Sequence, residues 1–92
     1  MSEQKIVTQH PHAGKSGRSI DLSKYQIIKS GLLKVLRGKE LTHNELFEQL
    51  IKELTGKFSG NISWYGETLK LDLEARGVIE RFGSKPQKYR LK

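Results

Sequence analysis

The chain contains no cysteine among its 92 residues. This absence excludes disulfide bonds, thiolate catalysis, cysteine-ligated zinc sites and iron–sulfur clusters. It also fits a reducing compartment, so a cytoplasmic location is expected. A domain of this length without disulfides depends on a single well-patterned hydrophobic core, which leaves no room for a second independent domain.

Long hydrophobic runs are also lacking. No stretch approaches the 18 or more apolar residues that a membrane span requires, and the first 19 residues have no apolar centre of the kind found in secretory signals. A soluble protein without a membrane partner is therefore expected.

Sequence signals for catalysis are weak. Residues 14–16 (GKS) resemble the end of a phosphate-binding loop, but that motif requires a glycine where this chain has Gln9. His10 and His12 have a spacing that could suit a metal, yet no further ligands accompany them. We therefore expect no enzyme activity, no metal and no cofactor.

Positive charge is abundant. Lysine and arginine number 17 against 10 aspartates and glutamates, which gives a formal net charge of +7. Such a charge favours polyanionic partners through long-range steering and counterion release, although many basic proteins bind nothing specific.

Hydrophobic periodicity divides the chain into two parts. Residues 1–20 hold few sizeable apolar groups and are predicted to form a flexible basic tail. From residue 21 onward apolar residues recur at spacings of three and four, so the domain is predicted to span residues 21–92.

Three helices are predicted in that domain. The first carries a periodic apolar face over residues 22–36 and is followed by Gly38. The second begins at a capping box formed by Thr42 and Glu45, and ends near Gly56. The third begins near residue 61 or 63 and ends at Gly77.

The third helix has two apolar stripes. Its main stripe is buried, and a flanking stripe contains Trp64 and Leu71, for which core packing or a dimer or partner interface is favoured over base stacking. The remaining polar side is predicted to consist of Ser63, Glu67, Lys70 and Glu74.

Two strands are predicted at the end of the chain. Residues 78–82 and 88–91 have strand patterns on either side of a short turn, and Leu41 could lend a minimal third strand. The expected fold class is therefore α+β: a winged helix, which is a three-helix bundle with a C-terminal β-hairpin wing.

Residues 73–81 (LEARGVIER) resemble the junction between recognition helix and wing in winged helix-turn-helix regulators of the multiple-antibiotic-resistance type. The longer run 64–81, together with residues 86–89, is similar to a group of short uncharacterised bacterial proteins. The first resemblance implies a DNA-binding, transcription-regulator-like protein whose third helix faces the major groove and whose wing contacts phosphates.

Charge is distributed unevenly over these parts. The third helix is net negative, whereas residues 77–92 hold five cationic residues and one acidic residue. Binding to DNA is thus expected to be dominated by backbone contacts and weakly selective. The candidate nucleic-acid-binding residues are Ser63, Lys70, Arg81, Lys85, Lys88 and Arg90.

Two alternatives to nucleic-acid binding stay open. The wing lysines could simply protect an exposed strand edge from aggregation. The stripe with Trp64 and Leu71 could instead make the domain a protein-interaction module, or a homodimer, that does not bind nucleic acid. The sequence does not distinguish DNA from RNA.

Overall fold

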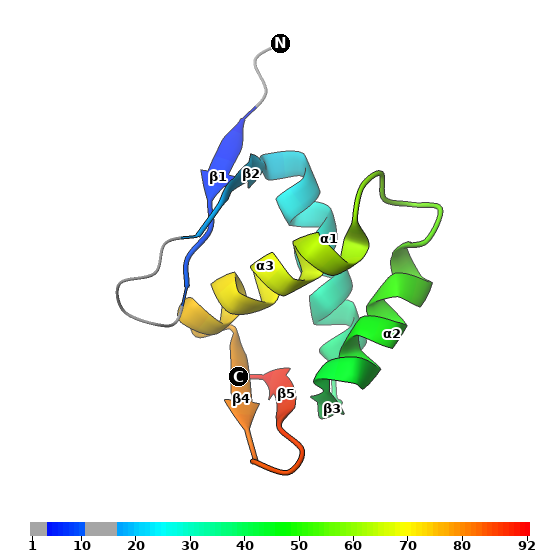
Figure 1. Cartoon of the computed structure of the whole chain (residues 1–92), viewed down its shortest axis with the longest axis vertical. Helices are drawn as coiled ribbons and strands as arrows, with labels where there is room; N and C mark the ends of the chain where they lie inside the picture. Colours follow the sequence, from blue (N-terminus) through cyan, green and yellow to red (C-terminus); the bar gives the residue numbers. More distant parts are fainter. Residues whose placement is uncertain (1–3, 11–16) are drawn as a thin grey trace.

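The described part of the chain forms three helices and two small antiparallel sheets, an α+β arrangement (Figure 1). The computed structural model describes residues 4–10 and 17–92. The predicted order of three helices followed by a C-terminal hairpin is confirmed, and a short strand lies between the first two helices.

The helices α1 (Leu22–Leu36), α2 (His43–Leu54) and α3 (Ile62–Ala75) enclose the core. Their apolar residues recur every three or four positions, so each helix presents one stripe to the others. The apolar helix side chains that are completely shielded from solvent are Ile28, Leu32, Leu36, Leu46, Leu50, Leu69 and Leu73.

Two helical glycines let the helices approach closely. A Cβ built on Gly66 of α3 would lie 2.8 Å from Leu50 Cδ2 and 2.9 Å from Phe47 Cε2. A Cβ on Gly31 of α1 would lie 3.0 Å from Leu50 Cδ1. Leu50 of α2 therefore packs into two places where the neighbouring helices have no side chain.

The helix ends follow the predicted signals. The Thr42 hydroxyl accepts a hydrogen bond from Glu45 N–H, and the Glu45 carboxylate accepts one from Thr42 N–H, which confirms the capping box. Asn61 caps α3 by accepting a hydrogen bond from Trp64 N–H. Gly77, which has a φ of 77°, follows α3 in the left-handed conformation that glycine adopts at low cost.

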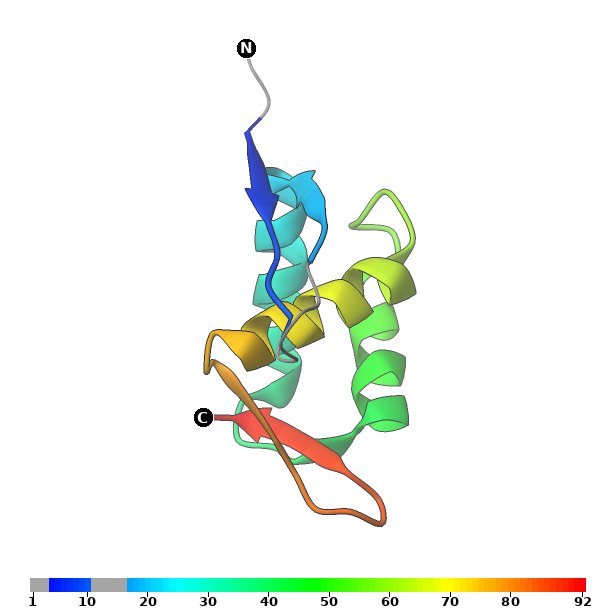
Figure 2. The ribbon, with the colours of Figure 1, turned by 60° about the vertical axis from the view of Figure 1, so that its left-hand side comes forward.

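A three-stranded sheet lies at the C-terminal end. Strands β4 (Ile79–Phe82) and β5 (Lys88–Leu91) form a hairpin, and β3 (Leu41–Thr42) pairs with the other edge of β5. In both views the hairpin projects beyond the three helices (Figures 1 and 2). Tyr89 pairs with Leu41 on one side and with Arg81 on the other, and its side chain is buried.

The N-terminal segment differs from its prediction as a structureless tail. Strands β1 (Lys5–Val7) and β2 (Ser19–Asp21) pair antiparallel before α1. Ile20 is buried in the core, and Ile6 packs against it. The physical reason is that these isoleucines and a buried acceptor on α3, described below, stabilise a short hairpin despite its polar composition.

No helix among residues 4–10 and 17–92 is long and apolar enough to cross a membrane.

Candidate nucleic-acid interface

The two wing arginines are held by carboxylates. Arg81 donates a 3.0 Å hydrogen bond from Nη2 to Glu74 Oε1 at the end of α3. Arg90 donates from Nε to Glu80 at 2.9 Å and from Nη1 to Glu40 at 3.0 Å. Both cations are therefore partly neutralised by their own protein, which lowers their attraction for phosphate.

The two wing lysines differ from the arginines. Lys85 lies in the exposed turn between β4 and β5, and Lys88 is half-buried at the start of β5. Neither forms an ion pair or a side-chain hydrogen bond with any residue of the described part of the chain. Of the predicted wing cations, these two remain the freest to meet a phosphate.

Lys70 was predicted on the polar side of α3, and that placement is wrong, because its side chain is only 4% exposed. Its Nζ donates to Tyr89 OH at 3.2 Å and to His43 Nδ1 at 3.1 Å, and it lies 3.4 Å from Glu67 Oε1. Helical periodicity places Glu67 beside Lys70, but it could not predict the contacts with His43 of α2 and Tyr89 of β5, which draw the side chain inward. Lys70 is therefore directed away from a groove contact.

His43, in the first turn of α2, completes this cluster. A lysine amino group only donates, so Nδ1 of His43 accepts and the proton of the neutral ring resides on Nε2, which lies 3.8 Å from Glu67 Oε2. The ring stacks on Phe47 with centroids 4.4 Å apart. Burial, together with the nearby Lys70, lowers the pKa of His43, while Glu67 opposes this shift.

Tyr89 joins the wing to the helices. The Lys70 Nζ lies 4.5 Å from its ring centroid and the Arg81 guanidinium carbon 5.5 Å from it. The Nε of Arg81 is buried without a hydrogen-bond partner in the described part of the chain. Two predicted binding residues, Lys70 and Arg81, are thus brought together around the buried ring of Tyr89.

Ser63 is separate from the wing. It is exposed in the first turn of α3, whereas the wing follows the last turn of the same helix. The outward side of α3 between them carries Trp64, which is 42% exposed, together with the half-buried Glu67 and Leu71. This side of the helix offers no exposed cation.

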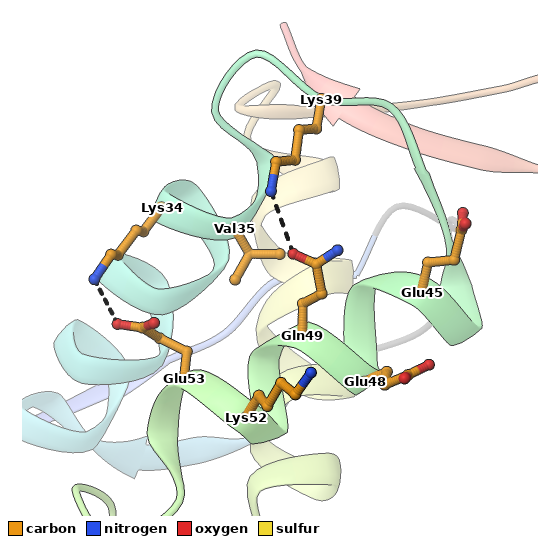
Figure 3. A pocket seen from close by; sticks show the side chains of 8 residues that line it. All are labelled: Lys34, Val35, Lys39, Glu45, Glu48, Gln49, Lys52 and Glu53. Carbon is orange, nitrogen blue, oxygen red and sulfur yellow. Dashed lines mark hydrogen bonds and ion pairs between the residues drawn. The ribbon is translucent and has the colours of Figure 1, made fainter.

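A groove of about 610 Å³ lies between α1 and α2 (Figure 3). Lys34 donates a 2.7 Å hydrogen bond to Glu53 across it, and Lys39 donates one of 3.4 Å to Gln49. Three lysines and three glutamates line the groove, so its charges balance and it does not attract a polyanion.

Sequence reasoning missed a second polar cluster, centred on Asp72 of α3. This carboxylate is fully buried and accepts hydrogen bonds from Tyr25 OH at 2.5 Å, from Gln9 N–H at 2.7 Å and from Arg76 Nε at 2.9 Å. Burial, followed by the bond to Asp72, raises the pKa of Tyr25 to about 12. The sequence did offer a signal for this cluster: Asp72 lies three residues after the buried Leu69, so helical spacing places it on the inward side of α3.

The described residues contain no group of three or more histidines and carboxylates that could hold a metal ion. His12 and residues 14–16, considered above as possible ligand or phosphate positions, lie outside the described residues.

A family model described as a family of unknown function, DUF6958, matches residues 5–89. No curated protein and no solved structure matches the chain. The family match includes the N-terminal strands β1 and β2 as well as the three helices.

Proposed function

We propose that this chain, which belongs to the DUF6958 family, is a winged-helix protein that binds DNA through its wing without catalysis. The order of α1, β3, α2 and α3, followed by the β4–β5 hairpin, supports the winged-helix assignment. So does the sheet order β3-β5-β4, in which β3 pairs with Lys88 and Tyr89 of β5 and the hairpin projects beyond the helices (Figure 1).

The observation that best supports nucleic-acid binding is the position of Lys85 and Lys88. Lys85 lies in the turn of the hairpin and Lys88 at the start of β5, and neither forms an ion pair within the described part of the chain. Hydrogen bonds with Thr42, and to a smaller extent the charge of Lys88, lower the pKa of Glu45, so Lys85 is the less compensated of the two lysines. The charges of Arg81 and Arg90, by contrast, are already paired. Phosphate contacts by lysines supply affinity but carry no sequence information.

Weak selectivity follows from the outward side of α3. Lys70 is buried, and Glu67 would repel phosphates while offering an acceptor only to cytosine amino groups. We infer a transcription-regulator-like or architectural role in which the wing contacts the backbone and α3 reads few bases.

Fluorescence anisotropy with a labelled random-sequence duplex tests the proposal. The wild-type protein is expected to bind at about 50 mM salt and to lose affinity steeply toward about 200 mM, because each phosphate contact releases counterions. No binding at the lower salt concentration would remove the nucleic-acid function and favour a protein-interaction module.

A further inference from the structure

A small cleft separates the N-terminal segment from the outward side of α3. Its volume is about 250 Å³. Trp64, Thr68 and Leu71 form its floor at spacings of four and three, so they share one face of the helix. The residues that face them from the N-terminal segment are Thr8, Gln9, His10, Gly17 and Arg18.

Hydrogen bonds fix the N-terminal wall of the cleft. Thr8 N–H donates to the Arg18 carbonyl at 2.8 Å, and Arg18 N–H donates to Thr8 Oγ1 at 2.7 Å. Gln9 N–H is tied to the Asp72 carboxylate, and a Cβ on Gly17 would overlap the Thr8 backbone. The cleft is therefore built before any ligand arrives, and both views show this segment running beside α3 (Figures 1 and 2).

The size and charges of the cleft restrict its ligand. Small-molecule pockets usually have volumes of at least roughly 300 Å³. This cleft is smaller, and its volume suits a single bulky side chain. Among the described residues that line it, the cation is Arg18 and the carboxylate is Glu67. The Glu67 carboxylate is half exposed and still disfavours a polyanion, but Lys70 Nζ lies 3.4 Å from it and partly neutralises its charge. A peptide with one charge of each sign therefore complements both residues, and its acidic residue beside Arg18 contributes more than its basic residue beside Glu67.

We propose that this cleft docks a linear segment of a partner protein. The segment places one large apolar side chain against Trp64 and Leu71, an acidic residue beside Arg18 and a basic residue beside Glu67. An exposed tryptophan beside a preformed pocket is the kind of anchor that dominates binding energy at protein interfaces. This docking does not depend on DNA binding by the wing.

A random 12-residue peptide library displayed on phage and panned against the full chain tests the proposal. Selected peptides are expected to share an apolar residue flanked by one acidic and one basic position. Their affinity can be followed by the fluorescence of Trp64, the only tryptophan in the chain.

Two substitutions locate the binding. Leu71→Ala should weaken a selected peptide by about tenfold or more, as expected for an anchor contact, whereas Ile51→Ala, at an exposed apolar residue of α2, should not. Arg18→Glu should weaken it by up to about fivefold, as for a surface ion pair. A peptide with its acidic residue replaced by lysine should then bind Arg18→Glu better than wild type.

Circular dichroism establishes whether Leu71→Ala folds. If Leu71→Ala does not fold, the exposed Arg18→Glu variant still tests the proposal. Lys85→Ala/Lys88→Ala should bind the peptides normally, which separates this surface from the proposed DNA contact.

Three results would overturn the proposal. The first is that the selected peptides share no pattern, and the second is that wild type and Arg18→Glu bind the selected peptide, and likewise the lysine-substituted peptide, with equal affinity. The third is that the cleft is occupied by something other than a peptide. The last would appear as self-association of the wild type, or as oligonucleotide quenching of Trp64, that Leu71→Ala abolishes.

Discussion

The Asp72 carboxylate accepts a 2.7 Å hydrogen bond from the backbone N–H of Gln9, 63 positions earlier in the chain. This contact joins the N-terminal hairpin to α3 at a site with no exposure to solvent. The same carboxylate receives Tyr25 OH from α1 and Arg76 Nε from the end of α3. One buried charge therefore connects three parts of the chain.

We predict that Asp72→Ala lowers the free energy of unfolding by about 3 kcal/mol, since the buried Tyr25 hydroxyl and the part-buried Gln9 N–H lose their acceptor, whereas Arg76 is partly exposed and stays hydrated. Tyr25→Phe should cost about 1.5–3 kcal/mol, the usual loss for a hydrogen bond to a charged group. Urea unfolding measures both. A chain that begins at residue 19 lacks the Gln9 donor. Truncation to residue 19 should therefore destabilise the Asp72→Ala variant less than it destabilises the wild type. Full additivity of the two changes would contradict the contact.

The Thr42 cap gives a second prediction. Thr42→Ala should destabilise the protein by about 1 kcal/mol, because the Glu45 N–H loses its acceptor at the start of α2. Thr42→Ser keeps the hydroxyl and is the matched control, expected to stay close to wild type. Thermal unfolding of the three proteins decides the matter. Equal stability of Thr42→Ala and wild type would mean that the cap contributes nothing.

His43 gives a prediction for pH. Since burial and Lys70 lower its pKa in the folded state, the fold favours the neutral ring. Its contribution to stability is complete above the ordinary pKa of 6.5 and is lost as the pH falls through the folded-state pKa. His43→Gln removes this titrating group and should show a smaller loss of stability on acidification.

Substitutions beside the ring should shift its titration in opposite directions. Lys70→Met removes a nearby cation and should raise the pKa of His43 part of the way toward its ordinary value, while Glu67→Gln removes the opposing carboxylate and should lower it further. The pH dependence of the His43 Hε1 chemical shift reports both. An unchanged pKa of His43 in both variants would mean that Lys70 and Glu67 do not influence its titration.

Local signals predicted the fold well. The capping box at Thr42, the glycine after α3 and the paired strand patterns each depend on residues a few positions apart, and the structure places elements there. The burial of Lys70 could not be predicted in this way, because His43 and Tyr89 lie 27 and 19 positions away. Periodicity assigns a residue to a helix face but does not say which element covers that face.

The N-terminal strands illustrate the same limit. Their own composition predicts no structure, and their stability depends on Asp72 and on the core around Ile20. Likewise, the charge count did not distinguish the wing cations from one another, whereas the structure separates Arg81 and Arg90, which form ion pairs, from Lys85 and Lys88, which form none within the described residues. Glu74, Glu80 and Glu40 engage Arg81 and Arg90, and only one of these glutamates belongs to the wing itself.

That separation yields the final prediction, on the salt dependence of DNA binding. If Lys85 and Lys88 contact phosphates, replacing both with alanine should reduce the slope of log K against log salt by up to about 1.8, at roughly 0.9 per lost contact. Arg90→Ala should reduce the slope by less than the roughly 0.9 expected for one phosphate contact, because Glu80 and Glu40 already compensate that charge. Lys70→Met should leave the slope unchanged, because its side chain is buried.

The charge-matched control is Lys29→Ala/Lys52→Ala, which removes one half-buried lysine from α1 and one exposed lysine from α2, neither of them in an ion pair within the described part of the chain. Its slope should equal that of the wild type, because net charge alone acts weakly once distant charges are screened beyond about 10 Å at 0.1 M salt. Anisotropy titrations over one salt series compare all the variants. If the control pair flattens the slope as much as the wing pair does, DNA is attracted by overall charge, and the wing has no special part in binding.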